Sequence, residues 1–398
     1  MGATIFAPEA RRMTIQVAHI TTIDFSLRHL LFNQLRSIRS AGYGVTGIST
    51  PGPDVPMLEE AGIRHIAATM TRNFTPGADL RALRRLVQIM RRERFTIVHT
   101  HNPKPGLLGQ LAARMAGVPI VVNTLHGFYF HAGMTPFWRK FYIFTEKVAA
   151  RCSDVILSQN AEDIATATQA GICTADAIRY LGNGIDITRF NRARLTAQTL
   201  GQLRHALGLQ QERPVVGFVG RLVAEKGILE LMEAARQVLA VKPTVQFLII
   251  GPIDHEKPDA LTPAIAVDYG VADAFTFTGL RHDMPELYAL MDLFVLPSHR
   301  EGFPRAPMEA SAMCVPAIVT DIRGCREAVE YGRNGLLTPL GDVAALREGI
   351  LTLLENPAQS AQMGAAGREM AETRFDEQFV FAKVKDVYRE LLTAKRLA

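Results

Sequence analysis

Two glutamates stand in the stretch HREGFPRAPMEASAM, residues 299–313, between a predicted buried strand and a predicted helix. Glu301 directly precedes a Gly-Phe-Pro-Arg turn, and Glu309 comes after seven intervening residues, in the early turns of the helix. Carboxylates so placed can accept hydrogen bonds from vicinal hydroxyls, as binding of a ribose or hexose requires. Both could equally be surface charges, with Glu309 favouring the positive end of the helix dipole. Their spacing leaves both interpretations open.

A second candidate is GFVGRLVAEKG, residues 217–227, in which Gly220 ends a strand and a helix begins after Lys226. Arg221 and Lys226 straddle the start of that helix, so fixed positive charge and free backbone N–H groups meet where a diphosphate could bind. The alternative is a solvated loop that carries a basic pair. The stretch is neither a Walker loop nor a GxGxxG fingerprint.

Short apolar strands alternate with amphipathic helices along the whole chain. TIQVAHI, FTIVHTH, PIVVNTLHG and DVILSQN belong to a first series, and PVVGFVGRL, VQFLIIG, LFVLPS and PAIVTD to a second. Continuous apolar strands separated by helices predict parallel sheets covered on both faces. The fold class is therefore α/β, with two doubly wound domains that offer the C-terminal ends of their strands to ligands.

Length and composition agree with two folded domains. The chain has 398 residues, 48% of them hydrophobic and 21% charged, with a net charge of +5. Its apolar runs are far shorter than the roughly 20 residues of a membrane-spanning helix. The four cysteines form no CxxC pair, which favours reduced thiols in the cytosol and no zinc or disulfide framework. The positive charge suits anionic ligands or an anionic membrane, and no nucleic-acid motif accompanies it.

The predicted domains derive from the two series. Residues 1–12 are expected to be a disordered leader, 13–192 an N-terminal domain, 193–374 a C-terminal domain, and 375–398 a helix that packs back on the first domain. Helices are predicted near 26–41, 55–61, 105–116, 136–151, 226–241, 284–291, 305–313, 325–330 and 342–355.

Three stretches together resemble a known family: GRLVAEKG, REGFPRAPMEA and PAIVTDIRGCREAVEYGRNGLLTPLGD. They are similar to the donor half of the retaining GT-B glycosyltransferases of the glycogen-synthase-like family, which carry an E-x7-E motif. VVNTLHGFYF and LGNGID resemble patterns of the first half, so the resemblance spans both domains. It implies two Rossmann-like domains that face an interdomain cleft, the N-terminal one for the acceptor and the C-terminal one for a nucleotide sugar.

The resemblance implies a role for each matching residue. Arg221 and Lys226, with Gly220, would hold the donor diphosphate and offset the charge of the leaving group. Glu309 would bind the ribose, and Glu301 would contact the donor sugar beside the backbone amides of Gly302 and Phe303. His126 would face the transferred sugar from the first domain, although a lone histidine at a strand end is more often structural.

The family also implies retention of the anomeric configuration by front-face attack, in which the departing diphosphate helps to deprotonate the acceptor. Neither glutamate is then a glycosidase-type acid or nucleophile. The chain has no D-x-D pair, the usual carboxylate bracket for a metal-bound nucleotide sugar. No metal and no cofactor are therefore expected.

Four first-half residues are weaker candidates for the acceptor side: Thr22, Ser26, Lys104 and Asn183. Many relatives carry a Gly-Gly loop after the first strand, whereas this chain has HITTIDFSLRHLL, so the details of that loop do not carry over. Lys104 precedes the helix begun by Pro105 and could meet an acceptor phosphate or be an exposed loop lysine. Asn183 belongs to LGNGID.

Two stretches of the first domain suggest a membrane-bound acceptor. DLRALRRLVQIMRRERF carries six arginines, and Leu80, Leu83, Val87 and Met90 form an apolar stripe at helical spacing that is expected to be core. HGFYFHAGMTPFWRKFYIF concentrates aromatic residues in a helix that is either buried on several sides or placed at a lipid interface.

The stretch HTHNPKPG, with GVPIVVNTLHGFYFH, also resembles bacterial transferases that extend polyprenyl-diphosphate-linked sugars for capsule, exopolysaccharide or glycoprotein glycans. The resulting hypothesis is a cytoplasmic enzyme on the inner face of the membrane. It would use a nucleotide sugar, expected to be a UDP-sugar with an N-acetylated sugar as one option, and a lipid-linked glycan acceptor, without nucleic acid.

Three alternatives remain open. A UDP-sugar 2-epimerase shares the architecture but would bind one nucleotide sugar and no acceptor. A dinucleotide-dependent oxidoreductase would need a glycine-rich fingerprint, and none is convincing here. A noncatalytic membrane protein could keep a transferase fold and use only its basic aromatic surface.

Overall fold

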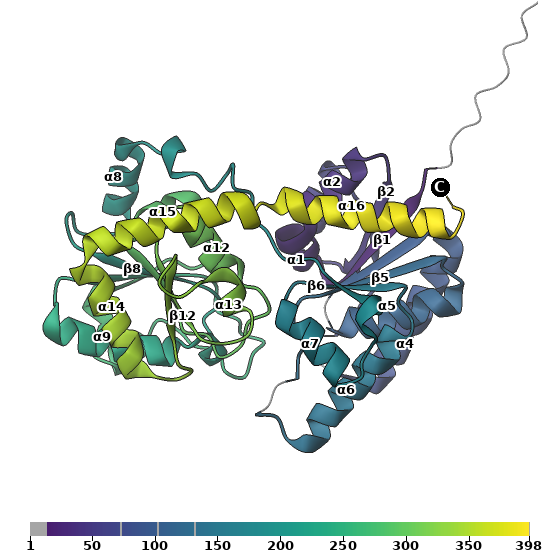
Figure 1. Ribbon diagram of the computed structural model, residues 1–398, viewed down its shortest axis with the longest axis horizontal. Coiled ribbons are helices and arrows are strands. Elements are labelled where there is room, and N and C mark those ends of the chain that lie inside the picture. The colour runs from purple at the N-terminus through teal and green to yellow at the C-terminus, as the bar shows by residue number, and fades with distance from the viewer. Residues whose placement is uncertain (1–13, 72–73, 102, 131–132, 398) are drawn as a thin grey trace, which may run out of the picture. The chain divides into compact units, whose positions relative to one another are not determined.

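A computed structural model of the protein describes residues 14–71, 74–101, 103–130 and 133–397. The predicted leader, 1–12, lies outside the described residues. The chain divides into two compact units, each containing one parallel sheet (Figure 1). Unit 1 takes the described residues up to Ser158, then Ile164–Tyr180 and the chain from Val384 onward, whereas unit 2 takes Gln159–Asp163 and Leu181–Lys383.

This division differs in detail from the predicted ranges. Residues 181–192, assigned from the sequence to the N-terminal domain, belong to unit 2, and so does the five-residue segment Gln159–Asp163. The C-terminal helix α16 (Glu377–Ala394) contributes to both units, because the division falls between Lys383 and Val384.

Unit 1 is built on a seven-stranded sheet of order β3-β2-β1-β4-β5-β6-β7, parallel at every pair. Its strands are β1 Gln16–Ile23, β2 Gly44–Thr50, β3 Arg64–Ala67, β4 Ile97–His101, β5 Ile120–Leu125, β6 Val155–Ser158 and β7 Ile178–Tyr180. The order reverses between β1 and β4, which is the point where ligands bind in open α/β sheets.

The unit 1 helices cover both faces of that sheet. They are α1 Asp24–Ser26, the π-helical turn η1 Leu27–Leu31, α2 Phe32–Ser40, α3 Val55–Glu60, α4 Pro76–Glu93, α5 Pro103–Ala116, α6 Pro136–Ala150, α7 Ala161–Gln169, the short 3-10 turn η2 Ala175–Ala177 and the last turns of α16. Alternation along the strands sends Ala18, Ile20 and Val98 into a core with α4 and α5.

The opposite face of the sheet is covered by α16. Val384, Tyr388 and Leu392 are buried at helical spacing along it. Lys385 donates to the Ser37 hydroxyl of α2 (3.1 Å), and Arg179 makes a two-pronged pair with Glu390 (2.6 and 2.7 Å). The part of α16 from Val384 onward therefore packs on the sheet of unit 1.

Unit 2 is built on a six-stranded parallel sheet of order β10-β9-β8-β11-β12-β13. Its strands are β8 Val215–Val219, β9 Gln246–Ile250, β10 Phe275–Phe277, β11 Leu293–Leu296, β12 Ala317–Thr320 and β13 Gly335–Thr338. Again the order reverses, here between β8 and β11. Two Rossmann-like sheets were predicted from the alternation of strands and helices, and both are confirmed.

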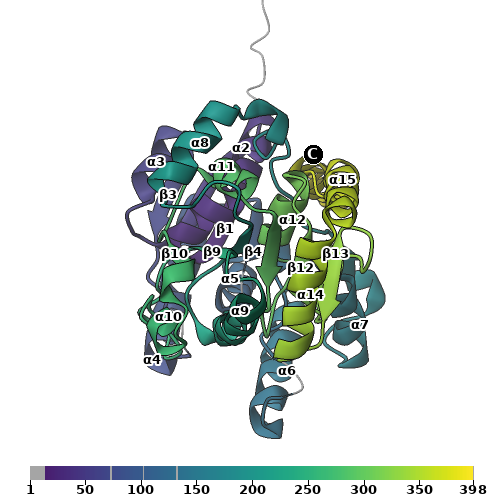
Figure 2. The same ribbon diagram turned by 90° about the vertical axis from the view of Figure 1, so that its left-hand side faces the viewer.

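The unit 2 helices flank this sheet. They are η3 Arg192–Arg194, α8 Ala197–Ala206, η4 Ala224–Lys226, α9 Ile228–Val241, α10 Ile265–Asp268, η5 Ala272–Ala274, α11 Met284–Ala289, α12 Arg305–Ala312, α13 Cys325–Ala328, α14 Val343–Glu355 and α15 Pro357–Arg374. In Figure 2, α9 and α14 lie side by side. α12 packs against α15. The strands and helices of unit 2 together bury one large hydrophobic core.

The structure corrects the predicted apolar stripe of α4 and decides how far the aromatic helix α6 is buried. Leu80, expected in the apolar stripe of α4, is 48% exposed, and Leu86 and Ile89 occupy the buried face instead. The aromatic helix α6 is not enclosed, because the side chains of Phe137 and Trp138 are 71% and 49% exposed. Within the described part of the chain, no helix combines the length and apolar character needed to cross a bilayer.

Candidate functional site

The loop after β8 is fixed by its backbone. The N–H of Gly220 donates to the Ile250 carbonyl (2.9 Å), and the chain then turns through Ala224–Lys226. Gly227 comes next, with φ +74°, and a Cβ there would lie 1.9 Å from the carbonyl oxygen of Pro297. Only glycine fits this approach, which holds the loops after β8 and β11 against each other.

The turn after β11 is held by two asparagines of unit 2. The side-chain amide of Asn160 donates to the Gly302 carbonyl (3.0 Å), and that of Asn183 donates to the Phe303 carbonyl (2.8 Å). Gly324, with φ +88°, approaches the same turn so closely that a Cβ would lie 2.4 Å from the Gly302 carbonyl oxygen. The turn that carries Glu301 is therefore rigidly supported.

Lys226 and Glu301, predicted separately from two motifs, meet directly. Lys226 Nζ lies 2.5 Å from Glu301 Oε1, and the Ser298 hydroxyl donates to the same oxygen (2.8 Å). The two charged side chains are only 18% and 10% exposed. A charge pair in such surroundings is screened little by solvent and is already oriented before any ligand arrives.

Arg221 is the more open cation of this region. Its Nη1 lies 2.5 Å from Asp254 Oδ2, and its side chain is 42% exposed. A second arginine, Arg300, pairs with Glu225 (2.7 Å) on the same pair of loops. We call Arg221, Lys226, Asp254 and Glu301 the charged cluster of unit 2.

Glu309 lies in the second turn of α12, beside Tyr288 of α11. The Tyr288 hydroxyl is 3.0 Å from Glu309 Oε2 and 3.1 Å from the Ala306 carbonyl oxygen. Burial raises the pKa of Glu309 above its ordinary value, against the opposing effects of the nearby Arg305 charge and the Tyr288 hydrogen bond. Burial, together with the neighbouring Glu309 carboxylate, also raises the pKa of Tyr288 well above its usual range.

In unit 1, His126 is the residue directly after β5. Its Nε2 lies 3.2 Å from Nδ1 of His101, the last residue of β4. His126 also lines a small cavity with Pro103, Thr124 and Glu146. His126 is therefore hydrogen-bonded to the C-terminal end of the neighbouring strand, β4.

Lys104 already holds a carboxylate near the N-terminus of α5. Its Nζ is 2.5 Å from Asp79 Oδ1 and donates to the Thr71 hydroxyl (2.6 Å), and its side chain is 13% exposed. An acceptor phosphate would have to compete with Asp79 for this lysine.

Thr22 and Ser26 lie partly buried on either side of Asp24. The Asp24 carboxylate accepts from the N–H groups of Phe25 (2.9 Å) and Asp54 (2.8 Å) and so pins the loop after β1. A π-helical turn, η1, comes directly after it, and such turns are frequent at functional sites.

Asn183 was assigned to the N-terminal domain, but it lies in unit 2 and supports the Phe303 carbonyl. The reason is that the chain enters unit 2 at Leu181, before the motif LGNGID has ended. Its place on the acceptor side stays a prediction. The other candidates of the C-terminal half, from Gly220 to Glu309, gather after β8 and β11.

Three residues of the site were missed. Asp254 comes just after the end of β9 in the sequence GPID, and a polar residue just past a buried strand is a signal that could have found it. Asn160 stands just after the end of β6 in the same way. Tyr288 carries no such signal, because it lies mid-helix, 21 residues from Glu309.

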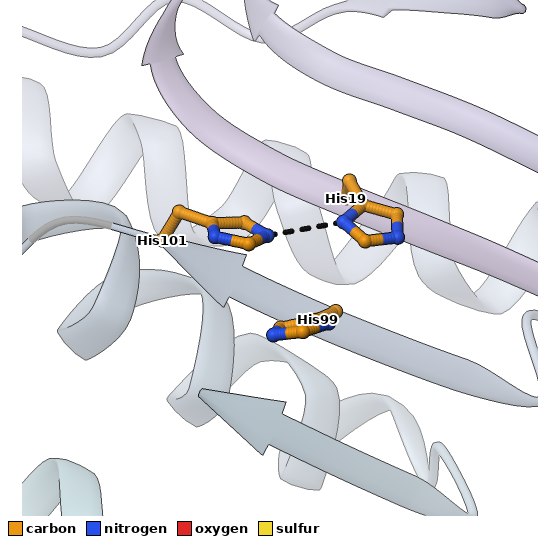
Figure 3. Close-up of side chains that lie close together, drawn as sticks. All are labelled: His19, His99 and His101. Atoms are coloured by element: carbon orange, nitrogen blue, oxygen red, sulfur yellow. Dashed lines mark hydrogen bonds between the residues drawn. The ribbon is translucent and has the colours of Figure 1, made fainter. Parts of the chain in front are cut away.

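One group of three metal-ligand side chains is found among the described residues. His19, His99 and His101 are buried, and one ring nitrogen of each lies within 4.8 Å of the others (Figure 3). Burial lowers the pKa of His19 to about 3 and keeps the pKa values of His99 and His101 well below the ordinary value. All three imidazoles are therefore neutral at pH 7.

Two family models match the chain. The one described as "Glycosyltransferase Family 4" covers residues 29–189, and the one described as "Glycosyl transferases group 1" covers residues 201–370. Together they span most of both units.

Similar proteins are bacterial transferases. The UDP-Gal:alpha-D-GlcNAc-diphosphoundecaprenol alpha-1,3-galactosyltransferase of Escherichia coli is 30% identical over 86% of this chain and 88% of its own length. The capsular polysaccharide biosynthesis glycosyltransferase CapM of Staphylococcus aureus is 27% identical over 95% of this chain and 97% of its own length. The crystal structure of Anabaena HepE in complex with UDP-glucose shares the fold, with a TM-score of 0.79 at 22% identity over 94% of this chain and all of that one.

Proposed function

Because the chain belongs to the glycosyltransferases of family 4 and group 1, with the GT-B fold, we propose that it transfers a sugar from a nucleotide-diphosphate sugar to a polyprenyl-diphosphate-linked acceptor. The single observation that carries the donor half of this proposal is the Lys226–Glu301 pair at the strand ends of unit 2. The name of the Escherichia coli relative supports a UDP-sugar as donor and a diphosphoundecaprenol-linked acceptor.

Each member of the charged cluster has a part in donor binding. The diphosphate takes the positive charge of Arg221 and Lys226, which Asp254 and Glu301 neutralise in its absence. Glu301, held by Ser298, then accepts hydrogen bonds from hydroxyls of the donor sugar. The backbone amides of Gly302 and Phe303 face the same ligand, while their carbonyls stay bound to Asn160 and Asn183.

Glu309 binds the ribose of the nucleotide. A buried carboxylate is costly when charged, and two ribose hydroxyls offer the donors that compensate for its lost water. Tyr288 supports one carboxylate oxygen, which leaves the other for the ligand.

The reaction retains the anomeric configuration. The bond between the sugar C1 and the diphosphate oxygen breaks, and a bond between C1 and the acceptor hydroxyl oxygen forms on the same face. The acceptor proton passes to the departing diphosphate, so the products are a nucleoside diphosphate and an extended lipid-linked glycan. Lys226 and Arg221 stabilise the charge that develops on the leaving group.

No metal or cofactor takes part in this proposal. Two fixed cations stand where the diphosphate charge would lie, and both are positioned by the protein itself. Turnover in excess chelator at an undiminished rate is the expected result, and a rate restored only by a divalent cation would refute it.

A peripheral contact with the anionic inner face of the cytoplasmic membrane completes the proposal. Phe74, Phe137 and Phe144 are 57%, 71% and 62% exposed, and Phe74 packs edge-on against Phe141 of α6 at 5.4 Å. Arg139 and Lys140 are exposed in the same helix. Exposed aromatic rings beside basic residues are typical of interfacial binding.

Donor calorimetry tests the transferase. We expect one UDP-sugar of a panel of UDP-, GDP- and ADP-sugars to bind in the presence of chelator, and Glu309→Ala to abolish that binding. Product analysis then separates transfer from epimerisation: a 2-epimerase would convert the donor without any acceptor. Absence of binding across the panel, in a folded protein, would count against the proposal.

Vesicle sedimentation tests the membrane contact. Neutralising Arg84, Arg85, Arg91 and Arg92 of α4, which are all exposed, should weaken binding to anionic vesicles, and Trp138→Ser should weaken it further. Arg204→Gln, in α8 of unit 2, serves as the control. Equal sedimentation of all variants would remove the membrane contact from the proposal.

A further inference from the structure

The helical turns that follow β1 carry positive charge without a paired carboxylate among the described residues. From Phe25 to Pro53 the sequence contains three arginines, Arg28, Arg36 and Arg39, and no acidic residue. None of the three forms an ion pair within the part of the chain that the structure describes. A folded protein seldom leaves a partly buried arginine in this condition without a reason.

Two of these arginines share one aromatic ring. Arg28 belongs to the π-helical turn η1, and Phe32 and Arg36 follow in α2 at helical spacing. The Cζ atom of Arg28 lies 4.4 Å from the centroid of the Phe32 ring, and that of Arg36 lies 5.7 Å from the same centroid. Both distances suit a cation–π contact. We call Arg28 and Arg36 the stacked arginines.

Stacking leaves the hydrogen-bond donors of a guanidinium unused, because they point outward in its own plane. The Nε of Arg28 is buried and has no hydrogen-bond partner. Its terminal nitrogens likewise have no acceptor among the described residues. Buried donors that lack an acceptor are destabilising, and each one in a native protein calls for an explanation. An anion at this position would supply the acceptor oxygens that Arg28 lacks.

The carboxylates at either end of the stretch are engaged elsewhere. Asp24 accepts from the backbone N–H of Asp54 (2.8 Å), and Asp54 Oδ2 lies 3.7 Å from His29 Nε2. Lys104, the other cation considered for an acceptor phosphate, is already paired with Asp79 at 2.5 Å. The stacked arginines are therefore better placed than Lys104 to take an external anion.

The position of these arginines in the sheet also suits a ligand. α1 and η1 follow the C-terminal end of β1 without a break, and the strand order of unit 1 reverses between β1 and β4 (Figure 1). Open α/β sheets bind their ligands at this point. Ser26, which the sequence predicts on the acceptor side, is two residues before Arg28.

We propose that Arg28 and Arg36 bind the diphosphate of the lipid-linked acceptor, and that Phe32 positions the two guanidinium groups. The identity of the ligand as an acceptor rests on the proposed function. A diphosphate offers oxygens to two guanidinium groups at once, and each arginine can bind them through paired N–H bonds. The diphosphate of the donor has its own cations in unit 2, Arg221 and Lys226.

Calorimetry with farnesyl diphosphate tests the site in the full chain. This soluble prenyl diphosphate carries the ionic group of the acceptor without its sugar. We expect it to bind in the presence of chelator, and Arg28→Gln to weaken the binding about 10-fold to 100-fold, because a charge-assisted contact is lost. Arg36 is exposed and farther from the ring, so Arg36→Gln should weaken the binding about twofold to fivefold.

Arg39→Gln is the matched control. It removes the same charge from the same helix, but the Nη1 of Arg39 donates to the Ala61 carbonyl (3.0 Å). We expect the affinity for farnesyl diphosphate to stay at the wild-type value. Equal losses in Arg28→Gln and Arg39→Gln would show that only net charge matters and would overturn the proposal, as would undiminished binding by Arg28→Gln.

Two further variants keep the test decisive. Phe32→Leu retains both charges and should weaken the binding about twofold to fivefold, because the ring that positions them is lost. Unchanged binding would refute the role of Phe32. Should Arg28→Gln not fold, the exposed Arg36 carries the test, and wild-type affinity in a folded Arg36→Gln protein would overturn the proposal.

Other sources of phosphate are separated by their own probes. UDP should bind the wild type and Arg28→Gln equally, because the donor is assigned to Arg221 and Lys226. Vesicles of phosphatidylglycerol should also bind both proteins equally, since the proposed membrane contact belongs to α4 and α6. If Arg28→Gln lost UDP or vesicle binding as strongly as farnesyl diphosphate binding, the site would belong to the donor or to the membrane, and the proposal would fail.

Turnover separates this inference from the proposed function. With a UDP-sugar and diphosphoundecaprenol-linked GlcNAc, the acceptor type in the name of the Escherichia coli relative, Arg28→Gln should raise the acceptor KM about 10-fold to 100-fold. The donor KM should not change, and Arg39→Gln should change neither value. Sugar transfer with an unaltered acceptor KM in Arg28→Gln would overturn the inference alone. Specific binding of farnesyl diphosphate without transfer by any variant or by the wild type would leave the arginine site and contradict the proposed function.

Discussion

In unit 2 the polar groups after β8 and β11 are ions that neutralise one another, whereas in unit 1 the polar groups of β1 and β4 are uncharged. The Lys226–Glu301 pair consists of opposite charges, so a charged ligand bound there would compete with it. The imidazoles of His19, His99 and His101 are buried and neutral, so they offer no charge to exchange. The same type of sheet therefore carries paired charges in one unit and buried, neutral imidazoles in the other.

Acidification should affect the two units differently, and this is the largest expected effect. The folded-state pKa of His19 is lowered to about 3 from an ordinary value of 6.5, so below pH 6.5 the unfolded chain binds more protons than the folded one. This contribution to stability is fully present above pH 6.5 and is lost as the pH falls towards 3. Within this pH range, each histidine whose pKa is lowered in this way reduces the free energy of unfolding by about 1.4 kcal/mol per pH unit.

Hydrogen exchange measured between pH 6.5 and 4.5 can track this loss in each unit. Protection factors, corrected for the intrinsic pH dependence of exchange, should fall for amides of β1 and β4. Those of β8 and β11 serve as the internal control and should change less. An equal fall in both sheets would contradict the distinction between the two units.

Lys226→Ala should then remove most of the electrostatic stabilisation of the leaving group. We expect kcat to fall about 10²–10³-fold, because a preorganised cation in a partly buried site is lost. Lys242→Ala is the control, since Lys242 pairs only loosely with Glu355 (3.4 Å). Steady-state kinetics measure the effect, and a Lys226→Ala enzyme with near wild-type kcat would show that charge does not govern the unit 2 site.

Two glycine substitutions distinguish overlap with the turn that carries Glu301 from the backbone strain of a positive φ alone. Gly324→Ala should destabilise the protein by about 3 kcal/mol, since a Cβ would overlap the turn that carries Glu301. Gly332→Ala has a similar φ, +77°, but open space around it, and should cost only about 1 kcal/mol. Urea unfolding gives both changes in the free energy of unfolding. Equal changes would show that the turn moves aside for the added Cβ without an energetic penalty.

Glu309→Gln is expected to have the smallest effect on stability and the opposite sign. Because burial raises the pKa of Glu309, ionisation of this side chain at neutral pH opposes folding, and its removal should raise the melting temperature slightly. Donor affinity should nevertheless fall about tenfold, since a charged acceptor for the ribose is lost. Calorimetry and thermal melts of the same sample test this combination, and a melting temperature that falls together with affinity would assign Glu309 a structural role.

The two centres also differ in how far they could be predicted. Arg221, Lys226, Glu301 and Glu309 lie in local motifs, each placed by one strand–loop–helix turn, so a resemblance in sequence carries them. Tyr288 and Asn160 were not predicted because they reach the site from other elements. The sheets themselves arise from apolar periodicity, which is a local property.

The buried group of His19, His99 and His101 could not be predicted from the sequence. His99 and His101 end the apolar stretch FTIVHTH, but their closeness to His19 depends on the pairing of β1 with β4. Tyr388 lies 369 residues from His19 along the chain, in a helix whose docking face is set by tertiary packing. The predicted range of the N-terminal domain included Asn183 for a related reason, since no local signal marks where the chain passes into unit 2.

The sharing of α16 between the units has a consequence for biosynthesis. The sheet of unit 1 is translated first, yet Val384, Tyr388 and Leu392, which cover one of its faces, come after Leu181–Lys383. At ribosomal speeds of about 5–20 residues per second, that intervening segment takes roughly 10–40 s to synthesise. During this interval the face of the first sheet that carries His19 and His99 lacks the helix that covers it, and unit 2 can complete its core before unit 1 does. An N-terminal domain usually folds ahead of the later parts of its chain, but here the earlier half must wait for the later one.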